Sequence, residues 1–408
     1  MNPMRSSSIR DEPPATERSG PAAPAVAATA GNARASDGAP APEPSPFAFA
    51  GGYAPHCAGI HALVRDGDGR VRARLATALP GSPTWLHLAD EGRRLHALLE
   101  ESHELATFAV RPADGALTLL SRHPTGGSLP VHLAMDESAR WAWIAHYGDG
   151  TLRSAALDAD GRLTPPDRVL MPRAGAEAPV ATDASADTPA DAPVTAGALV
   201  AAGSSAASHA HMVRRHPRWP LMLATDLGRD LLRVWRCHGS ADELEELDGL
   251  ALPPGSGPRH FVWHPRDPSQ LYLLNEQANA LDWLGLDEAG SLTHRLRLSS
   301  LPAGFDGLSY ASDLLVMPDG RRLFALNRLH DAIAVFDLDA AGRPSWRGEV
   351  WAQGSYPRSA TLSPDGRELW VSLQRSHQVC VFRLEADALP RFDGRFVAMP
   401  GAACVVFR

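Results

Sequence analysis

Three histidines lie within a twelve-residue stretch of the chain, SHAHMVRRHPRW at residues 208–219. His209 and His211 are separated by one residue, so in a β-strand both side chains would point to the same face. This spacing suits a pair of metal ligands, and it suits equally a row of hydrogen-bonding groups along a cleft. The stretch by itself leaves both interpretations open.

Similar segments recur along the chain and place further chemical groups at matching positions. SPTWLHL, LPVHLAM, SHAHMV, GPRHFVW, YASDLLV and YPRSATL each come shortly before an apolar, strand-like run. Counting back from those runs gives one predicted ring of residues: Trp85, His132, His211, His260, Asp313 and Ser359. The position before it contributes Arg259 and Arg358. An inner strand with so many titratable groups indicates a polar cleft.

A second predicted ring comes from the polar break after each of these runs. It contains His146, Asp226, Asn275 and Asn327, and the next position adds Glu276 and Arg328. We expect Asp226, Asn275 and Asn327 to hold turns by hydrogen bonding to the backbone. Arg259 and Arg328 need anionic partners if they are buried, and Glu276 and Asp313 are candidates for that role.

The elements that position these residues form repeats of about 50 residues, a period typical of β-propeller blades. LYLLNEQANALDWLGLDEAGSL, LFALNRLHDAIAVFDLDAAGR and LWVSLQRSHQVCVFRLEADAL each read as two strands around a polar break. MPDGRR and SPDGRE supply Asp-Gly pairs, which favour tight hairpin turns. A parallel α/β fold is disfavoured because no segment between the strands shows a strong helical period.

The predicted fold is therefore all-β, a seven-bladed β-propeller. Six repeats leave FAFAGGY near Phe47 and CVVFR at the C-terminus, and pairing of these two strands would close the ring through a seventh blade. Residues 1–46, rich in Ala and Pro, are expected to be a disordered tail, and the propeller to span 47–408 with a low-complexity insert at about 173–207. The N-terminus has no long apolar segment of a secretion signal, so we expect a cytoplasmic protein.

Composition excludes several classes of function. The formal net charge is −8, with 39 Lys and Arg against 47 Asp and Glu, which disfavours a nucleic-acid-binding protein. The sequence contains no run of eighteen apolar residues, so no membrane span is predicted. The four cysteines contain no CxxC pair, so neither a zinc site nor a disulfide framework is indicated.

The sequence resembles the bacterial 6-phosphogluconolactonase type of seven-bladed propeller, the lactonase family. The resemblance runs from about Phe47 to Arg408 and rests on SHAHMV, TDLGRDLLRVW, GSGPRHFVWHP, LLNE, NRLHDAIAVF and CVVFR. The chain departs from the family pattern at three positions: Ser208 replaces a proline, Asp313 a glutamate and His146 an asparagine.

The resemblance implies hydrolysis of 6-phosphoglucono-δ-lactone to 6-phosphogluconate, with no metal and no cofactor. The chemistry needs a base for water, donors for the oxyanion and donors for the phosphate. The candidate catalytic residues are His211, His260, Arg259, Glu276 and Asp313. The candidate substrate-binding residues are His132, His209, Arg328, His330 and Arg358.

Alternatives to this reaction remain open. The same arginines could bind a carboxylate in a related lactone reaction of the muconate-cyclase type, or the propeller could bind a ligand or protein without catalysis. His209, His211, His260 and Asp313 could in principle hold a metal, but neighbouring arginines disfavour a cation. The sequence has no Gly-x-Ser-x-Gly elbow, so a serine nucleophile is not predicted. The expected partner is a small sugar-phosphate lactone, with no nucleic acid and no membrane, and the expected state a monomer or weak dimer.

Overall fold

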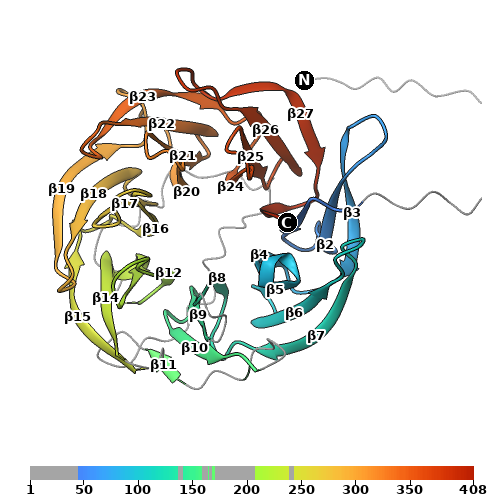
Figure 1. Ribbon diagram of the computed structural model, residues 1–408. Helices are drawn as coiled ribbons and strands as arrows, with labels where there is room; N and C mark the ends of the chain where they lie inside the picture. Colours follow the sequence, from blue (N-terminus) through green and yellow to red (C-terminus); the bar gives the residue numbers. More distant parts are fainter. Residues whose placement is uncertain (1–44, 137–140, 159–163, 165–167, 171–206, 239–242) are drawn as a thin grey trace, which may run out of the picture. The chain divides into compact units, whose positions relative to one another are not determined.

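A ring of antiparallel sheets makes up the protein, for which the computed structural model describes residues 45–136, 141–158, 164, 168–170, 207–238 and 243–408. Seven four-stranded sheets follow one another around a central channel (Figure 1). Within the described residues the helical segments are two short 3₁₀ turns, η1 (Asp90–Gly92) and η2 (Leu227–Arg229). The predicted all-β, seven-bladed propeller is confirmed.

Six blades are built from consecutive segments, each with its first strand against the channel and its fourth at the rim (Figure 1). The first three contain β4 (Pro83–Ala89), β5 (Arg94–Leu99), β6 (Glu104–Val110) and β7 (Leu117–Pro124); β8 (Pro130–Met135), β9 (Trp141–His146), β10 (Leu152–Ala156) and β11 (Arg168–Leu170); and β12 (Ala210–Arg215), β13 (Leu221–Asp226), β14 (Leu231–His238) and β15 (Glu243–Ala251). The next three contain β16 (Pro258–Trp263), β17 (Gln270–Asn275), β18 (Ala280–Leu286) and β19 (Leu292–Ser299); β20 (Tyr310–Val316), β21 (Arg322–Arg328), β22 (Ala332–Leu338) and β23 (Pro344–Trp351); and β24 (Pro357–Leu362), β25 (Glu368–Leu373), β26 (Gln378–Arg383) and β27 (Arg391–Ala398).

The seventh blade joins the two ends of the propeller. Its strands lie in the order β28 (Ala402–Phe407), β1 (Ala48–Gly52), β2 (Gly59–Arg65) and β3 (Val71–Ala78). β1 pairs antiparallel with β28, so that Ala48 lies opposite Phe407 and Gly52 opposite Ala402. The predicted closure of the ring by the N- and C-terminal strands is confirmed.

The hydrophobic core lies between neighbouring blades. Middle strands such as β13 and β17 are buried along their whole length, because both of their faces are covered by adjacent sheets. One cluster of buried side chains joins the blades of β12–β15 and β16–β19, and includes Leu223, Phe261 and Leu273. The outer strands, such as β15, are largely exposed and carry alternating charged residues. This gradient explains why the middle strands read as continuous apolar runs.

Tight turns end the inner strands as the Asp-Gly pairs predicted. Gly320 and Gly366 have φ angles of +66° and +68°, in the left-handed region that glycine adopts without steric cost. The amide of Gly320 donates to the carbonyl of Met317 and that of Gly366 to Ser363, which closes each turn.

A β-bulge interrupts the pairing of every inner strand at the same level. In β16, Pro258 pairs with Asn275 and His260 with Leu274, which leaves Arg259 as the extra residue. In β12, Ala210 pairs with Asp226 and Met212 with Thr225, so His211 is the extra residue. The bulge turns two successive side chains toward the channel instead of one.

This register corrects one of the predicted rings. His211 occupies the level of Arg259 and Arg358, and Met212 takes the place beside His260 that the sequence alignment gave to His211. The alignment of SHAHMV with GPRHFV was wrong by one residue, because the segment was matched on its histidines rather than on its bulge.

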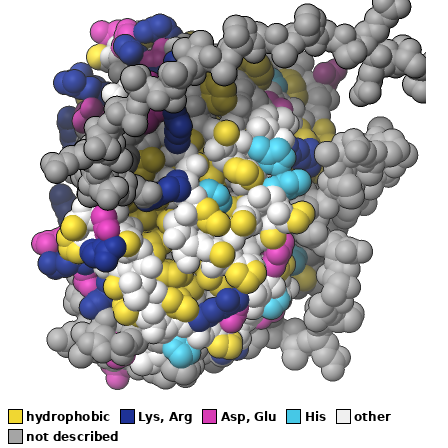
Figure 2. Space-filling model, turned by 90° about the vertical axis from the view of Figure 1, so that its right-hand side faces the viewer, with side chains coloured by type: hydrophobic (Ala, Val, Ile, Leu, Met, Phe, Trp, Pro, Cys, Tyr) yellow, Lys and Arg dark blue, Asp and Glu magenta, His cyan; other side chains and the backbone are white. Residues whose placement is uncertain are grey.

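The surface on one side of the propeller is mixed in character. Figure 2 views the side on which β3 and β7 lie in Figure 1, and apolar, charged and histidine side chains are interspersed there. Among the described residues no helix is long and apolar enough to cross a membrane. The predicted disordered tail at 1–46 and the insert at 173–207 fall almost entirely outside the described residues.

Candidate active site

Three charged side chains meet at the opening of the channel where the inner strands begin. The Glu276 carboxylate accepts from Arg259 Nη1 at 2.6 Å and from Arg328 Nη2 at 2.8 Å. Both arginines are buried, and Glu276 follows β17 at the level of the bulge in β16. We call Arg259, Glu276 and Arg328 the arginine cluster.

The two arginines determine the charge state of Glu276. Burial alone would raise the pKa of this carboxyl, but the charges and hydrogen bonds of Arg328 and Arg259 outweigh it and lower the pKa to about 2. Glu276 is therefore ionised at neutral pH and a weak base. Its place in the cluster is that of the anion that holds the two guanidinium groups together.

The two arginines differ in the donors that remain free. Arg328 donates Nε to the Tyr310 carbonyl, Nη1 to the Tyr356 hydroxyl and Nη2 to the Ala311 carbonyl. Arg259 donates Nε to the Ser312 carbonyl at 2.6 Å and Nη1 to Glu276, which leaves its Nη2 donors for a ligand. The geometry thus gives Arg328 a supporting role and leaves Arg259 available for chemistry.

The loop that leads into β16 is fixed by a carboxylate from the preceding blade. Asp230 accepts from the amides of Gly255 at 2.8 Å and Gly257 at 2.7 Å. Gly257 has a φ of +61°, which a side chain would make unfavourable. These contacts hold the start of β16 and therefore the position of Arg259.

A layer of histidines lies next to the cluster in the channel. The ring of His260 lies 5.1 Å from that of His211 and 6.3 Å from that of His132, measured between centroids. Trp85 packs on His132 with its ring centroid 4.3 Å away. All three imidazoles are buried, with exposed fractions of 3% to 5%.

Burial keeps these histidines neutral. It lowers the pKa of His211 well below the usual value, and the charge of Arg259 lowers it further. The pKa of His132 is also lowered by burial, with His260 and Arg214 adding to the effect. The Nδ1 atoms of both His211 and His132 are buried and have no hydrogen-bond partner in the described structure. A neutral imidazole with a free nitrogen can accept a proton.

His260 and Asp313 form a hydrogen-bonded pair. His260 Nδ1 lies 2.7 Å from Asp313 Oδ1, and Asp313 also accepts from the amides of Leu314 and Ala360. Burial would raise the pKa of Asp313, but the His260 contact and these amides lower it overall. The ionised carboxylate can only accept, so His260 carries its proton on Nδ1 and has a free Nε2.

A second network surrounds Arg358 on the far side of the channel from β12. Arg358 Nη2 donates to the Tyr53 hydroxyl, and the guanidinium carbon lies 4.8 Å from the centre of the Tyr53 ring. Tyr53 in turn donates to Glu100 at 2.9 Å, and the Thr84 hydroxyl donates to the same carboxylate at 2.7 Å. Burial raises the pKa of Tyr53 well above its usual value, so the phenol remains a donor.

The remaining sequence-predicted residues lie in different places. His209 stacks on Tyr147 with 4.6 Å between ring centroids and contacts the Tyr147 carbonyl through Nδ1 at 2.7 Å, beside the histidine layer. His330 is directed to the outer strand β23, where its Nε2 contacts Glu349 at 2.9 Å, and it packs on Phe305. The structure therefore brings His209 to the site and holds His330 apart from it.

The hydrogen bonds to the backbone predicted for three polar residues are present, and among these contacts the one from Asn275 spans a turn of its own blade. Asp226 accepts from the Ser208 hydroxyl and the His209 amide, Asn275 donates to the Ala280 carbonyl, and Asn327 donates to the Ser300 carbonyl. Tyr53 and Tyr356 were missed by the sequence analysis. Tyr53 belongs to the closing blade, for which no repeat supplied a register, and Tyr356 lies in a turn between blades.

The donor set does not favour a metal. Among the described residues no group of three or more His, Cys, Asp or Glu side chains is arranged to hold a metal ion. The histidine layer also lies beside Arg259, whose positive charge would oppose a bound cation.

Comparison with known proteins shows the family. The 6-phosphogluconolactonase of Bacillus subtilis is 24% identical over 306 residues, which cover 74% of this chain and 80% of the relative. That of Formosa agariphila is 24% identical over 318 residues, with 74% and 82% covered. The solved structure of the periplasmic gluconolactonase of Pseudomonas aeruginosa superposes with a TM-score of 0.75 at 24% identity, covering 88% of this chain and 98% of that one. Residues 47–407 match the family described as "Lactonase, 7-bladed beta-propeller", and the chain belongs to that family.

Proposed function

We propose that this protein hydrolyses a sugar lactone, 6-phosphoglucono-δ-lactone, to 6-phosphogluconate, as a step of the pentose phosphate pathway. The observation that carries the proposal is the buried neutral His211 at the same level of the channel as Arg259, whose Nη2 donors are free. The lactonase family and the 6-phosphogluconolactonase names of the curated relatives support it.

His211 is the general base in this mechanism. It takes a proton from a water molecule in the channel, and the water oxygen attacks the carbonyl carbon of the lactone. A positioned base of this kind contributes about 10² to 10⁴-fold. Because burial and Arg259 disfavour the imidazolium, His211 holds the proton only briefly. The ring of His260, which is hydrogen-bonded to Asp313, packs edge-on against the ring of His211.

Arg259 stabilises the charge that develops on the substrate. Water attack converts the carbonyl into a tetrahedral oxyanion, which accepts from Arg259 Nη2. The intermediate then collapses, the bond between the carbonyl carbon and the ring oxygen breaks, and the leaving oxygen takes the proton held by His211. The products are the open-chain acid and the unchanged protein. Removal of one such donor typically costs about 10² to 10³-fold in rate.

Arg358 is the better of the two arginines proposed for the substrate phosphate. Among the described residues, Arg358 donates a hydrogen bond through Nη2 alone, to Tyr53, whereas Arg328 is hydrogen-bonded through all three nitrogens. His132 and His209 line the channel between β8 and β12 and supply further donors to the sugar hydroxyls.

Phosphorylated sugars do not cross membranes freely, so we infer that the protein acts in the cytoplasm, which cell fractionation tests. We also infer that it is a monomer or weak dimer, which light scattering tests.

The test is hydrolysis of freshly prepared 6-phosphoglucono-δ-lactone, corrected for spontaneous opening, with and without EDTA. We expect turnover that resists EDTA and falls at least about 10²-fold in Arg259→Ala. Arg347→Ala is the matched control, because Arg347 pairs with Asp337 at the outer edge of a blade and lies outside the channel cluster. Turnover no faster than the spontaneous reaction would rule out this substrate, and turnover abolished by EDTA would rule out the metal-free mechanism.

A further inference from the structure

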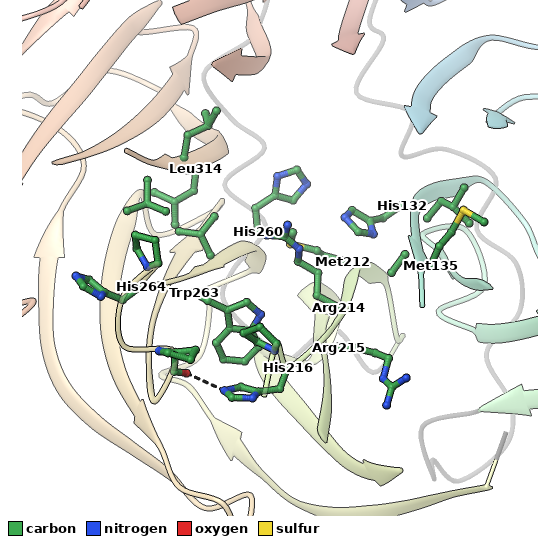
Figure 3. Close-up of a pocket in the computed structure, with 18 of the residues that line it drawn as sticks. His132, Met135, Met212, Arg214, Arg215, His216, His260, Trp263, His264 and Leu314 are labelled. Carbon is green, nitrogen blue, oxygen red and sulfur yellow. Dashed lines mark hydrogen bonds between the residues drawn. The ribbon is translucent and has the colours of Figure 1, made fainter. Parts of the chain in front are cut away.

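The opposite half of the channel, where the inner strands end, contains a pocket of about 1360 Å³. It is lined by the inner strands of six blades and reaches the histidine layer at His132, His260 and Asp313 (Figure 3). The arginine cluster and Arg358 do not line it. Pockets that hold small molecules typically measure about 300–1,000 Å³, so this one has room for such a ligand.

Arg214 supplies a positive charge inside this pocket. Strand alternation in β12 directs Met212 and Arg214 to the channel and buries Val213 in the core. Figure 3 shows Arg214 directed toward the histidines, whereas its neighbour Arg215 points away from them and lies over the ring of Trp143. The position of Arg214 was not singled out by the sequence, where it reads as part of a basic turn.

No described residue forms a hydrogen bond or an ion pair with the guanidinium of Arg214. Two carboxylates line the pocket, and both have other partners. Asp313 binds His260 and two backbone amides, and Asp136 accepts from the amide of Trp141. This contrasts with the first half of the channel, where Glu276 forms ion pairs with both Arg259 and Arg328. Arg214 is exposed to solvent in the channel and feels the charge of Asp313 without forming an ion pair with it, so its donors are available to an anion from solution.

Two histidines from the neighbouring blades complete the set of donors. His87 on β4 and His132 on β8 both feel the charge of Arg214, which lowers their pKa values in addition to the main effect of burial. The Nδ1 atom of His132 is buried and unpaired in the described structure. Arg214, His87 and His132 come from three consecutive blades and line the same pocket, and donors from several sides suit the oxygens of a tetrahedral anion.

We propose that this pocket is a second site, which binds the phosphate group of a small phosphate monoester through Arg214, His87 and His132. The site lies on the opposite side of the histidine layer from Arg259 and shares His132 with the proposed hydrolytic centre, but it does not depend on the reaction assigned to that centre. Trp85, Met135 and Met212 line the same pocket and offer an apolar surface to the organic part of the ligand.

Equilibrium dialysis of the full-length protein with radiolabelled inorganic phosphate tests the proposal. We expect phosphate binding that weakens at least about tenfold in Arg214→Gln, with a smaller loss in Arg214→Lys, which retains the charge without the fork. Arg218→Gln is the matched control, because Arg218 lies in the turn at the rim of the same pocket. Arg259→Ala, which disrupts the other half of the channel, should retain the Arg214-dependent binding.

Three results would overturn the proposal. The first is that the wild type binds no phosphate at millimolar concentration. The second is that Arg214→Gln binds phosphate as tightly as the wild type. The third is that acetate displaces the bound phosphate as effectively as glycerol 3-phosphate does. Thermal melting of each variant shows whether it is folded. Lactone turnover, measured on the same samples, keeps the two ideas distinct: a protein without lactonase activity that still binds phosphate through Arg214 would refute only the proposed function.

Discussion

Glu276 is the residue on which the arrangement of the arginine cluster depends. Two buried guanidinium groups repel each other, and the carboxylate between them turns that repulsion into two short ion pairs. Removing one partner of a buried ion pair typically costs about 3–5 kcal/mol, because the remaining charge is left without compensation. The position of Arg259, and with it the proposed oxyanion contact, therefore relies on a residue that does no proton transfer itself.

We predict that Glu276→Gln destabilises the protein and changes how its stability depends on pH. The pKa of Glu276 is lowered from 4.5 to about 2, so its contribution is complete above pH 4.5 and is lost as the pH falls toward 2. Urea unfolding at several pH values should show the wild type losing its advantage over Glu276→Gln across that window. An advantage that stays constant from pH 5 to pH 2 would contradict the assigned ion pairs.

For His211, we predict that the substitution His211→Gln lowers kcat/KM about 10² to 10⁴-fold. Because the pKa of His211 is well below its usual 6.5, the wild type should keep its activity on acidification through pH 6. Rates measured from pH 5 to 7.5, after subtraction of spontaneous hydrolysis, check both points. His238→Gln on the exposed end of β14 is the control and should match the wild type.

Residue types at this site were predictable from the sequence, and their exact neighbours were not. The repeat placed Arg259, Glu276 and Arg328 in adjacent registers, because equivalent positions of different blades meet in the channel. It did not reveal that Arg328 donates hydrogen bonds to Tyr310, Ala311 and Tyr356, since those contacts depend on rotamers and on turns between blades. His330 was expected at the site from its sequence position, but Glu349 on β23 holds it elsewhere.

At the scale of the elements, close approach of strands limits which residues can occupy the closing blade. A Cβ atom on Gly51 would lie 2.0 Å from the Pro83 carbonyl oxygen, and one on Gly52 would lie 2.4 Å from that of Gly401. The two glycines therefore let β1 pack against β4 and β28. The FAFAGGY segment was recognised as a strand from its apolar residues, but its glycines reflect packing that the sequence alone does not show.

We predict that Gly51→Ala destabilises the propeller by about 1–3 kcal/mol, the usual cost of overpacking. Gly67→Ala is the matched control, because a Cβ there meets no atom within 4 Å. Chemical denaturation of the two variants should show a lowered midpoint for Gly51→Ala alone. Equal midpoints would mean that β1 and β4 can separate at no cost.

At the scale of the whole molecule, closure of the ring depends on one short strand from each end of the propeller, β1 with five residues and β28 with six. Strand β28 lies in the core of the last interface, where Ala402 packs with Ala48 and Trp370. The fold class and the closure were predictable because strand repeats, leftover terminal strands and channel geometry all agree. The alignment within β12 was not, because the segment was matched on its histidines, and the position of the bulge that sets the register leaves no mark in the sequence.

We predict that a chain ending at Pro400 loses cooperative unfolding and is cut rapidly by proteases between β1 and β4. Loss of β28 exposes one edge of β1 and uncovers the apolar residues of the neighbouring blade. Thermal melting and limited proteolysis measure this. Removal of residues 1–44 is the control, expected to leave the melting temperature within about 2 °C of the wild type, since the Ala- and Pro-rich composition of this segment predicts no packed core. A truncated chain that melts like the full-length protein would show that the ring closes without its terminal pairing.

The antiparallel pairing of β1 and β28 also has a mechanical consequence. Ala48 and Phe407, where the chain enters and leaves the propeller, lie opposite each other at the same end of the two strands. A pull on both ends would load the hydrogen bonds one after another, starting at that pair, as in opening a zip. Strands pulled in shear share the load among all their bonds, so this propeller should open at low force despite its extensive core.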